Sequence, residues 1–165
     1  MHNTHVLFAA LALGAAAMAH GAELTAECKP VMTAMERSIQ TDHATITTHG
    51  TQIMKGVTVG GAIYVQSRGA WVKSPITVQE NLAMSRENLK DATEFSCKVL
   101  PDSVIDGTPV TNYATHNASP DSVMDSRIAI AKGTGLAVRV ENHPAGDPGG
   151  AMVTTYSYGN VKAPI

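Results

Sequence analysis

The chain of 165 residues has few aromatic side chains, few cysteines and no strong charge of either sign. Phe, Trp and Tyr make up 4% of it, and its 12 basic and 14 acidic residues leave a formal net charge of −2. A nucleic-acid-binding protein would need a basic patch or an aromatic-basic stripe, and neither is present in the sequence. The length is that of one domain.

The sequence also lacks the common motifs of catalysis and metal binding. It contains no Gly-x-Ser-x-Gly, no His-x-x-x-His and no Cys-x-x-Cys. The segment "AKGTG" at 131–135 has the composition of a phosphate loop, but Lys132 precedes the glycines and a strand-like segment follows them. A phosphate loop has its lysine after the glycines and opens a helix. We therefore expect a protein that is not an enzyme and has no metal or cofactor.

The N-terminus has the pattern of a secretory signal peptide. Residues 6–13 form a short apolar run, followed by Gly14 and small residues that end in Ala17-Met18-Ala19. The run is shorter than the roughly 20 residues that a membrane span requires, and no later segment could span a bilayer. We expect cleavage after residue 19, or as late as residue 22, which leaves 20–165 as a single domain in the periplasm.

Two cysteines, Cys28 and Cys97, remain in the exported chain. An even pair in an oxidising compartment indicates a disulfide. The alternative is lipid modification of Cys28 as an N-terminal residue, but Glu27 stands directly before it where a small residue is required. We therefore expect a disulfide in a protein without a lipid anchor.

Two segments have the pattern of helices. Residues 24–40 repeat apolar side chains at steps of three and four, and Pro30 restricts the regular helix to a start near Cys28. Residues 77–90 follow Pro75 and begin with a Thr-x-x-Glu capping box formed by Thr77 and Glu80.

The other segments have the alternation of β-strands. We expect a single strand in the threonine-rich segment 43–54 and another over 57–67, with Gly60-Gly61 as a bulge that leaves Val59, Ile63 and Val65 on one face. Asp106-Gly107 favours a tight hairpin. The remaining expectations are strands at 93–100, 109–116 and 151–161, loops at 117–124 and 143–150, and a hairpin over 127–141 whose turn is "AKGTG".

This order of elements predicts an α+β fold. A helix, some strands, a second helix and then a run of strands on hairpin turns indicate an antiparallel sheet. The two helices would cover one face of a strongly curved sheet.

The hairpin "SRIAIAKGTGLAVRVE" and the closing "YSYGNVKAP" resemble the periplasmic lipoprotein carriers, the Lol-type half-barrel proteins, and small uncharacterised exported proteins of that shape. The resemblance implies an incomplete antiparallel barrel with an apolar cavity under its helices, which would accept an acyl chain or another hydrophobic ligand. No ligand-binding residue of the carriers can be matched to a position here. The cavity residues that we expect are therefore the apolar ones of the helix and strand faces: Met35, Val59, Ile63, Val65, Ile128, Ile130, Leu136, Val138 and Val140.

Two functions remain open at this stage. One is a periplasmic binding protein for a hydrophobic or lipid-like ligand, and the other is an envelope protein that binds itself or a partner through its sheet. A weaker third hypothesis is copper or nickel capture by histidines, including His20 near the mature terminus. Without ligand spacing, we expect the later histidines to be surface residues: His43, His49, His116 and His143.

Overall fold

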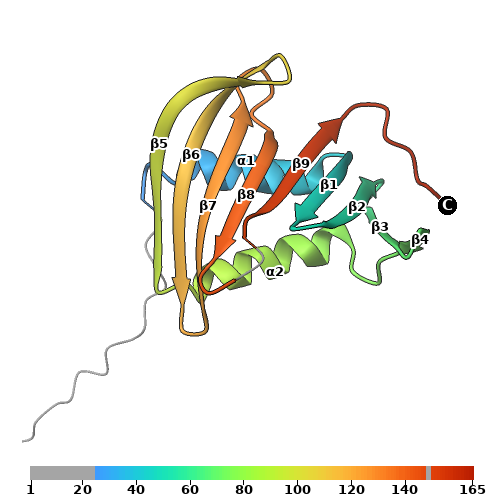
Figure 1. The fold of residues 1–165 in the computed structure, drawn as a ribbon, viewed down its shortest axis with the longest axis horizontal. Helices are drawn as coiled ribbons and strands as arrows, with labels where there is room; N and C mark the ends of the chain where they lie inside the picture. The colour runs from blue at the N-terminus through green and yellow to red at the C-terminus, as the bar shows by residue number, and fades with distance from the viewer. Residues whose placement is uncertain (1–24, 148–149) are drawn as a thin grey trace, which may run out of the picture.

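The computed structural model describes residues 25–147 and 150–165, which form two helices and one antiparallel sheet of nine strands (Figure 1). The expected signal peptide lies outside the described residues. In chain order the elements are α1 Lys29–Gln40, β1 His43–His49, β2 Gln52–Val59, β3 Ala62–Ser67, β4 Ala70–Lys73, α2 Val78–Lys90, β5 Glu94–Ile105, β6 Thr108–Ser119, β7 Ser122–Ala131, β8 Ala137–Pro144 and β9 Met152–Tyr158.

The sheet consists of two meanders that meet at its middle. Strands β1 to β4 form the first and β5 to β9 form the second, in the spatial order β4-β3-β2-β1-β9-β8-β7-β6-β5. Seven antiparallel residue pairs between β1 and β9, from His43 opposite Tyr158 to His49 opposite Met152, join the two meanders. The strand at the C-terminal end of the chain was predicted, but its central position in the sheet was not.

Both helices lie on the same face of this sheet. Helix α1 runs across the strands of the second meander and contacts α2, β7 and β8, while α2 connects β4 to β5 (Figure 1). The sheet is not closed into a barrel, and the predicted α+β half-barrel with two covering helices is confirmed. No helical segment of the described chain has the length and apolar character that crossing a bilayer requires.

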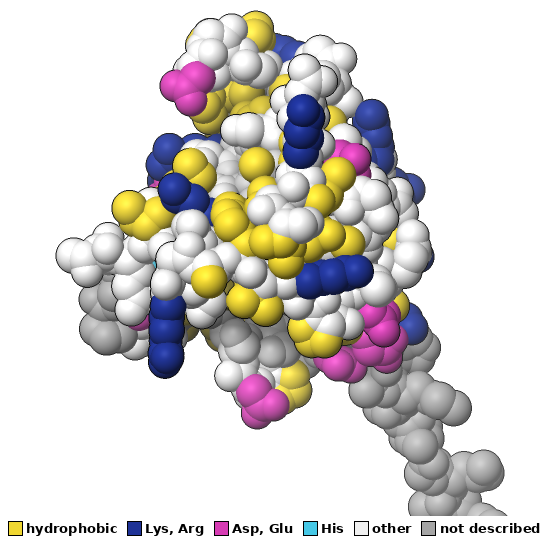
Figure 2. Space-filling view, turned by 90° about the vertical axis from the view of Figure 1, so that its right-hand side faces the viewer, with side chains coloured by type: hydrophobic (Ala, Val, Ile, Leu, Met, Phe, Trp, Pro, Cys, Tyr) yellow, Lys and Arg dark blue, Asp and Glu magenta, His cyan; other side chains and the backbone are white. Residues whose placement is uncertain are grey.

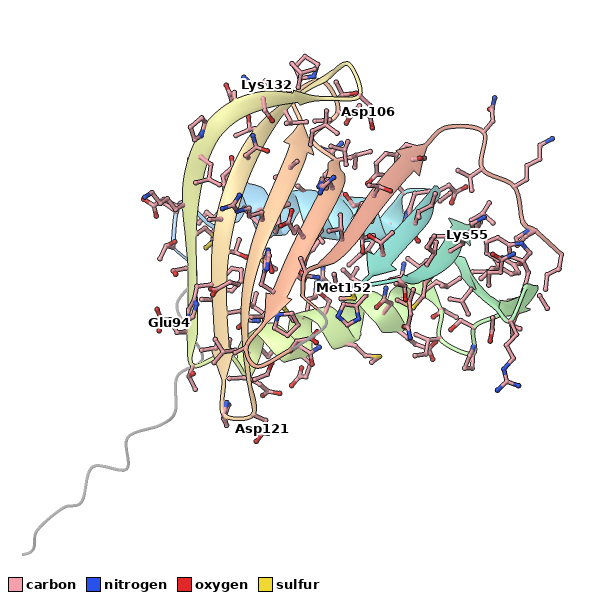
Figure 3. All side chains as sticks on the ribbon, viewed as in Figure 1. Lys55, Glu94, Asp106, Asp121, Lys132 and Met152 are labelled. Carbon is pink, nitrogen blue, oxygen red and sulfur yellow. A yellow bond between two sulfur atoms is a disulfide. The ribbon has the colours of Figure 1, made fainter. Side chains whose placement is uncertain are left out.

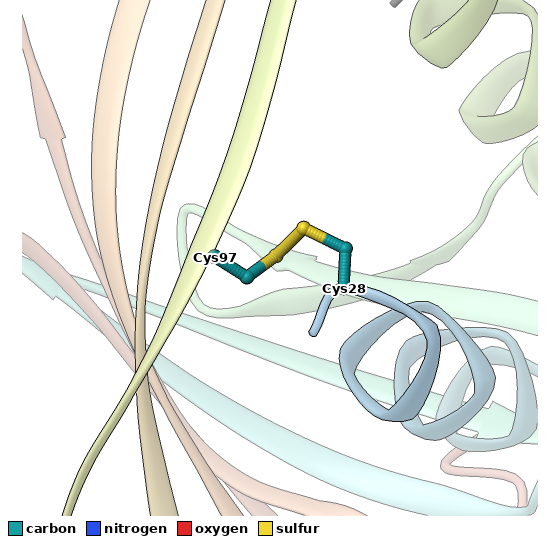
Figure 4. Close-up of a disulfide and its surroundings, with 2 residues drawn as sticks. All are labelled: Cys28 and Cys97. Atoms are coloured by element: carbon teal, nitrogen blue, oxygen red, sulfur yellow. A yellow bond between two sulfur atoms is a disulfide. The ribbon is translucent and has the colours of Figure 1, made fainter. Parts of the chain in front are cut away.

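Helix α1 begins where the sequence predicted. Cys28 is its N-cap residue and Pro30 lies in the first turn, where a missing N–H costs no intrahelical bond. Cys28 is fully buried and forms the predicted disulfide with Cys97 of β5, which fixes the start of the helix to the edge of the sheet (Figure 4). The bonded sulfur leaves Cys28 no thiol to carry a lipid.

Helix α2 has the predicted capping box. The Glu80 backbone N–H donates to Thr77 Oγ1 over 3.2 Å, and the Thr77 backbone N–H donates to Glu80 Oε2 over 2.7 Å. The two helices are joined by a bidentate pair in which Arg86 Nε and Nη2 donate to the Glu36 carboxylate over 2.8 and 3.1 Å. The hydrogen bond from Arg86 lowers the pKa of Glu36.

Three of the predicted strand boundaries were wrong, and in each case a two-residue turn is the reason. Residues 43–54 form two strands, because Gly50 takes a positive φ of 56° in a turn. Gly60 and Gly61, with φ of 57° and 78°, make the turn between β2 and β3 instead of a bulge. The loop expected at 117–124 is almost entirely strand, since β6 runs to Ser119 and β7 begins at Ser122.

The other two hairpin predictions are confirmed. Asp106 and Gly107 have φ of 47° and 79° and connect β5 to β6. The segment "AKGTG" connects β7 to β8, and its Lys132 pairs with the Asp102 carboxylate and lowers the pKa of that carboxyl. Figure 3 shows Asp106 and Lys132 at one end of the sheet and Asp121, in the β6–β7 turn, at the other.

The core lies between α1 and the strands of the second meander. A bulge between Ala129 and Ile130 shifts the β7–β8 register, so Ala137 pairs with Ile130 and Val140 pairs with Ile128. The core cluster consists of buried residues of α1, β6, β7 and β8: Val31, Ala34, Tyr113, Ile128, Ile130, Ala137 and Val140.

Candidate functional site

A cavity of about 320 Å³ lies between the two helices and the sheet. Helix α1 closes it with Val31, Met32 and Met35, while α2 contributes Ser85, Asn88 and Leu89. The strands supply side chains at alternating positions, which is the pattern of one face of a sheet. Those residues are Phe95, Thr115, Asn117, Met124, Ser126, Ile128, Val140, Asn142, Thr154 and Tyr156.

A second space of about 240 Å³ adjoins the first toward β1, β2 and β3. Three side chains, Met35, Thr154 and Tyr156, line both spaces. The second one is otherwise lined by Ser38, Ile39, His43, Thr45, Thr58, Ile63 and Asn81. Together they form an elongated hollow that follows the helix-covered face of the sheet from β5 to β3. We call the pair the helix–sheet cavity.

The lining of the helix–sheet cavity contains no Asp, Glu, Lys or Arg. Its polar groups are hydroxyls, amides and the His43 imidazole, and several of them already form hydrogen bonds with neighbouring side chains. Ser126 Oγ donates to Asn142 Oδ1 over 2.7 Å, and the hydroxyls of Thr47 and Thr154 lie 2.8 Å apart. Asn117 Oδ1 is different, because this buried oxygen has no hydrogen-bond partner among the described residues.

Aromatic rings form one wall of the cavity. The His43 ring centroid lies 5.5 Å from that of Tyr156 and 5.9 Å from that of Tyr158. Burial, and then the neighbouring Tyr158, raise the pKa of Tyr156 to about 12, so its phenol is neutral at physiological pH. The expectation that His43 is a surface residue was wrong: it is 7% exposed, and its Nδ1–H donates to the Thr41 carbonyl over 2.6 Å.

The structure brings four of the nine expected cavity residues together. Met35, Ile128 and Val140 line the larger space, and Ile63 lines the adjoining one. Ile130 lies on the other side of α1, where it lines a separate groove of about 440 Å³.

The other four lie away from the helix–sheet cavity, and strand geometry gives the reasons. The turn at Gly60-Gly61 pairs Val59 with Ala62, so Val59 faces the side of the sheet opposite Ile63. Val65 shares the face of Ile63 but is 45% exposed, because it lies toward the sheet edge. Leu136 is buried in the turn before β8, and Val138 is the extra residue of the bulge.

The polar half of the lining was not predicted from the sequence. Thr115, Asn117, Ser126, Asn142 and Thr154 all face the helices, although only apolar side chains were expected there. Strand alternation predicts part of this polar set. Ser126 stands two residues before Ile128 and Asn142 two residues after Val140, so each shares the strand face of a residue that was expected to line the cavity.

The remaining histidines lie next to carboxylates outside the helix–sheet cavity. His116 Nδ1 lies 2.7 Å from Asp125 Oδ1, His143 Nε2 lies 2.9 Å from Glu141 Oε1, and His49 Nε2 lies 2.9 Å from Asp147 Oδ2. Over residues 25–147 and 150–165, no group of three or more His, Cys, Asp or Glu side chains is placed to hold a metal ion.

No protein-family model matches the sequence, and no curated protein matches it either. Several solved structures are similar to it over most of its length. The chain is 16% identical to the Mycobacterium tuberculosis lipoprotein LppX, with a TM-score of 0.45 over 85% of this chain and 95% of that one. It is 11% identical to LprF from Mycobacterium bovis, with a TM-score of 0.49 over 86% and 95% of the two chains.

A third solved structure is MucB in complex with MucA(peri), to which the chain is 12% identical. The TM-score is 0.48, and the similar parts cover 83% of this chain and 56% of that one. These similarities are structural only, and the TM-scores are modest.

Proposed function

We propose that the protein binds an uncharged, lipid-like ligand in the helix–sheet cavity and acts as a binding protein without catalytic activity. The observation that carries this proposal is an elongated space whose walls combine apolar side chains with hydroxyls and amides and contain no Asp, Glu, Lys or Arg. Sites for small molecules have this character, with volumes of about 300–1,000 Å³ and a few placed polar groups.

The apolar part of the ligand would lie against Met32, Met35, Leu89 and Phe95. Methionine side chains are flexible and polarisable, so they adapt to chains of different shape. The unpaired Asn117 Oδ1 would accept a hydrogen bond from a hydroxyl or amide of the ligand, which removes the cost of a buried acceptor without a partner. A charged group would find no opposite charge in the lining.

The disulfide supports a location in an oxidising compartment, and we place the protein in the periplasm. Export through residues 1–19 and cleavage after Ala19 are part of the same proposal. N-terminal sequencing of the purified protein tests the cleavage site.

Binding is tested with a fluorescently labelled monoacylglycerol, an uncharged lipid, as the probe and with native mass spectrometry of the gently purified protein. Thr154 borders both spaces of the helix–sheet cavity, so Thr154→Phe should fill their junction and weaken probe binding by at least about tenfold. Thr155→Phe is the matched control, because the next residue of β9 points to the opposite face. Thr47→Val removes the same threonine–threonine bond without filling the cavity.

The result that supports the proposal is a bound lipid mass or probe binding in the wild type, lost in Thr154→Phe and kept in both controls. An unliganded wild-type mass together with no probe binding contradicts it. Equal binding by Thr154→Phe and the wild type also contradicts it, because the probe would then occupy another site.

The second candidate is self-association through the edge strand β5. This strand has 12 residues and is paired on one side only, and its Val99 and Val104 are 54% and 66% exposed. Long, flat, apolar edges are templates for pairing with another chain. Sedimentation of the wild type and of Val99→Lys tests this candidate, which requires a dimer that the charge disrupts.

A further inference from the structure

Exposed apolar side chains are concentrated at the β2–β4 end of the sheet. Of the eleven large apolar side chains exposed in the described chain, six lie within residues 46–76: Ile46, Ile53, Met54, Val65, Val72 and Ile76. Figure 2 looks onto the molecule from the side of this end and shows apolar side chains gathered there, with Lys and Arg side chains around them. A concentration of this kind marks an interaction surface.

Strand register makes part of this surface continuous with the helix–sheet cavity. Val65 lies directly opposite Val72 on the neighbouring strand, so the two side chains share a face. Ile63 stands two residues before Val65 on the same face and lines the smaller space of the cavity. An apolar strip therefore runs from inside the cavity to the free edge β4.

The same end of the sheet has more cations than acids. Residues 43–79 contain Lys55, Arg68 and Lys73 and none of the 14 acidic residues of the chain. Asp42 stands directly before this segment, and its Oδ1 accepts a hydrogen bond from the Gly60 backbone N–H over 3.0 Å in the β2–β3 turn. All three basic side chains are exposed, and none of them makes an ion pair within the part of the chain that the structure describes. Lys55 projects from β2 at this end (Figure 3).

We propose that this β2–β4 end docks onto an anionic lipid surface. Apolar side chains next to an excess of cations are complementary to a membrane interface, which takes up apolar groups and attracts Lys and Arg through its negative potential. Trp71 of β4 adds an aromatic ring of the type that is enriched at such interfaces.

The docking geometry follows from the alternation of β4. Val72 points to the helix-covered face and Lys73 to the opposite face, so an approach along the edge brings both side chains to the lipid. If the helix–sheet cavity binds a lipid-like ligand, as proposed above, docking would bring the β3 side of the cavity to the membrane. The ligand could then pass between membrane and cavity along the strip formed by Ile63, Val65 and Val72. The docking itself does not depend on that ligand.

The experiment is co-sedimentation of the full chain with vesicles of phosphatidylcholine alone and with vesicles that also contain phosphatidylglycerol. We expect binding to the anionic vesicles, weaker binding at higher salt because exposed charges are screened, and little binding to phosphatidylcholine. Lys55→Glu combined with Lys73→Glu should reduce binding to the anionic vesicles by at least about tenfold. Val65→Ser combined with Val72→Ser should reduce it as well.

Matched controls come from the other edge of the sheet. Val99→Ser with Val104→Ser changes two valines of β5 that are more exposed than Val65 and Val72, and Lys98→Glu changes an exposed lysine of the same strand. These variants should bind like the wild type. The proposal is overturned if the wild type does not bind anionic vesicles, or if the β5 variants lose as much binding as the β2–β4 variants. If the protein binds no vesicles but dimerises through the β2–β4 end, the docking proposal is also overturned, and this surface is an interface between two protein chains.

The variant Thr154→Phe separates this proposal from the proposed function. It should lose the fluorescent monoacylglycerol and still bind anionic vesicles. If the wild type takes up the monoacylglycerol without binding vesicles, the docking proposal fails and the proposed function stands. If it binds vesicles but no monoacylglycerol, only the proposed function fails.

Discussion

Ser38 joins helix α1 to the sheet by accepting a hydrogen bond from the Ala137 backbone N–H, with 2.9 Å between Ser38 Oγ and the nitrogen. The serine is 1% exposed and donates its own proton to the Ala34 carbonyl over 2.8 Å. The carbonyl of Ala137 also has a side-chain partner, because the Tyr158 hydroxyl donates to it over 2.6 Å. Side chains from α1 and β9 thus satisfy both backbone groups of Ala137, next to the bulge of β7 and β8.

The substitution Ser38→Ala should destabilise the protein by about 1–3 kcal/mol, because it leaves the buried Ala137 N–H without an acceptor. Urea unfolding followed by circular dichroism measures the loss. The control is Thr33→Ala on the exposed side of the same helix, which should change the free energy of unfolding by less than about 0.5 kcal/mol. Equal effects of the two substitutions would show that the Ser38 bond contributes nothing.

Removal of the disulfide by Cys28→Ser with Cys97→Ser should cost about 4 kcal/mol, since the bond closes a long loop in the unfolded chain. The two cysteines are 69 residues apart in the sequence. Chemical denaturation of the double variant and of the wild type with and without reductant measures the effect. The reduced wild type should match the variant, and an unchanged midpoint in both would refute this expectation.

Thr77→Ala should cost about 1 kcal/mol, because it removes the N-cap of α2. Thr77→Ser keeps the hydroxyl and should retain most of the stability. Thermal unfolding of the three proteins under identical conditions gives the comparison. If the serine variant loses as much as the alanine variant, the hydroxyl is not the cause.

The pair His116–Asp125 should make stability depend on pH. The hydrogen bond that His116 donates to the Asp125 carboxylate raises the pKa of His116 above its ordinary value of 6.5, and the negative charges of Asp125 and Glu94 add to this. A raised pKa in the folded state means that the stabilisation is complete below pH 6.5 and disappears as the pH rises through the raised value.

Unfolding curves across this range test the dependence, with Asp125→Asn as the comparison. The difference in stability between wild type and variant should be larger at the acidic end and shrink toward higher pH. Titration of the His116 ring by nuclear magnetic resonance gives its pKa directly. A pKa at or below the ordinary value would refute the expected pH dependence.

The sequence predicted those features that depend on local rules. The helix start at Cys28 with Pro30 in the first turn, the capping box of Thr77 and Glu80, and the Asp106-Gly107 turn each rest on the chemistry of a few adjacent residues. The disulfide could be predicted because only two cysteines exist.

What the sequence could not predict depends on pairing between distant segments. In a single continuous strand, Val59 and Ile63 would lie on the same face. The chain instead reverses at Gly60-Gly61, and the two side chains therefore lie on opposite faces of the sheet. The burial of His43 follows from its place beside Tyr156 and Tyr158, and β9 reaches that place only by pairing with β1. The polar lining of the helix–sheet cavity was missed for a different reason, since a threonine or asparagine in a strand looks like a solvent-facing residue until a helix is known to cover it.

The position of β9 between β1 and β8 has a consequence for the order of folding. Each meander can form its own hairpins early, but strand pairing joins the first to the second only through residues 152–158, close to the end of the chain. Contacts this far apart in sequence form slowly, because a large loop must close before they are made. The nascent chain would therefore keep two unmatched sheet edges, at β1 and β8, until residues 152–158 have been synthesised.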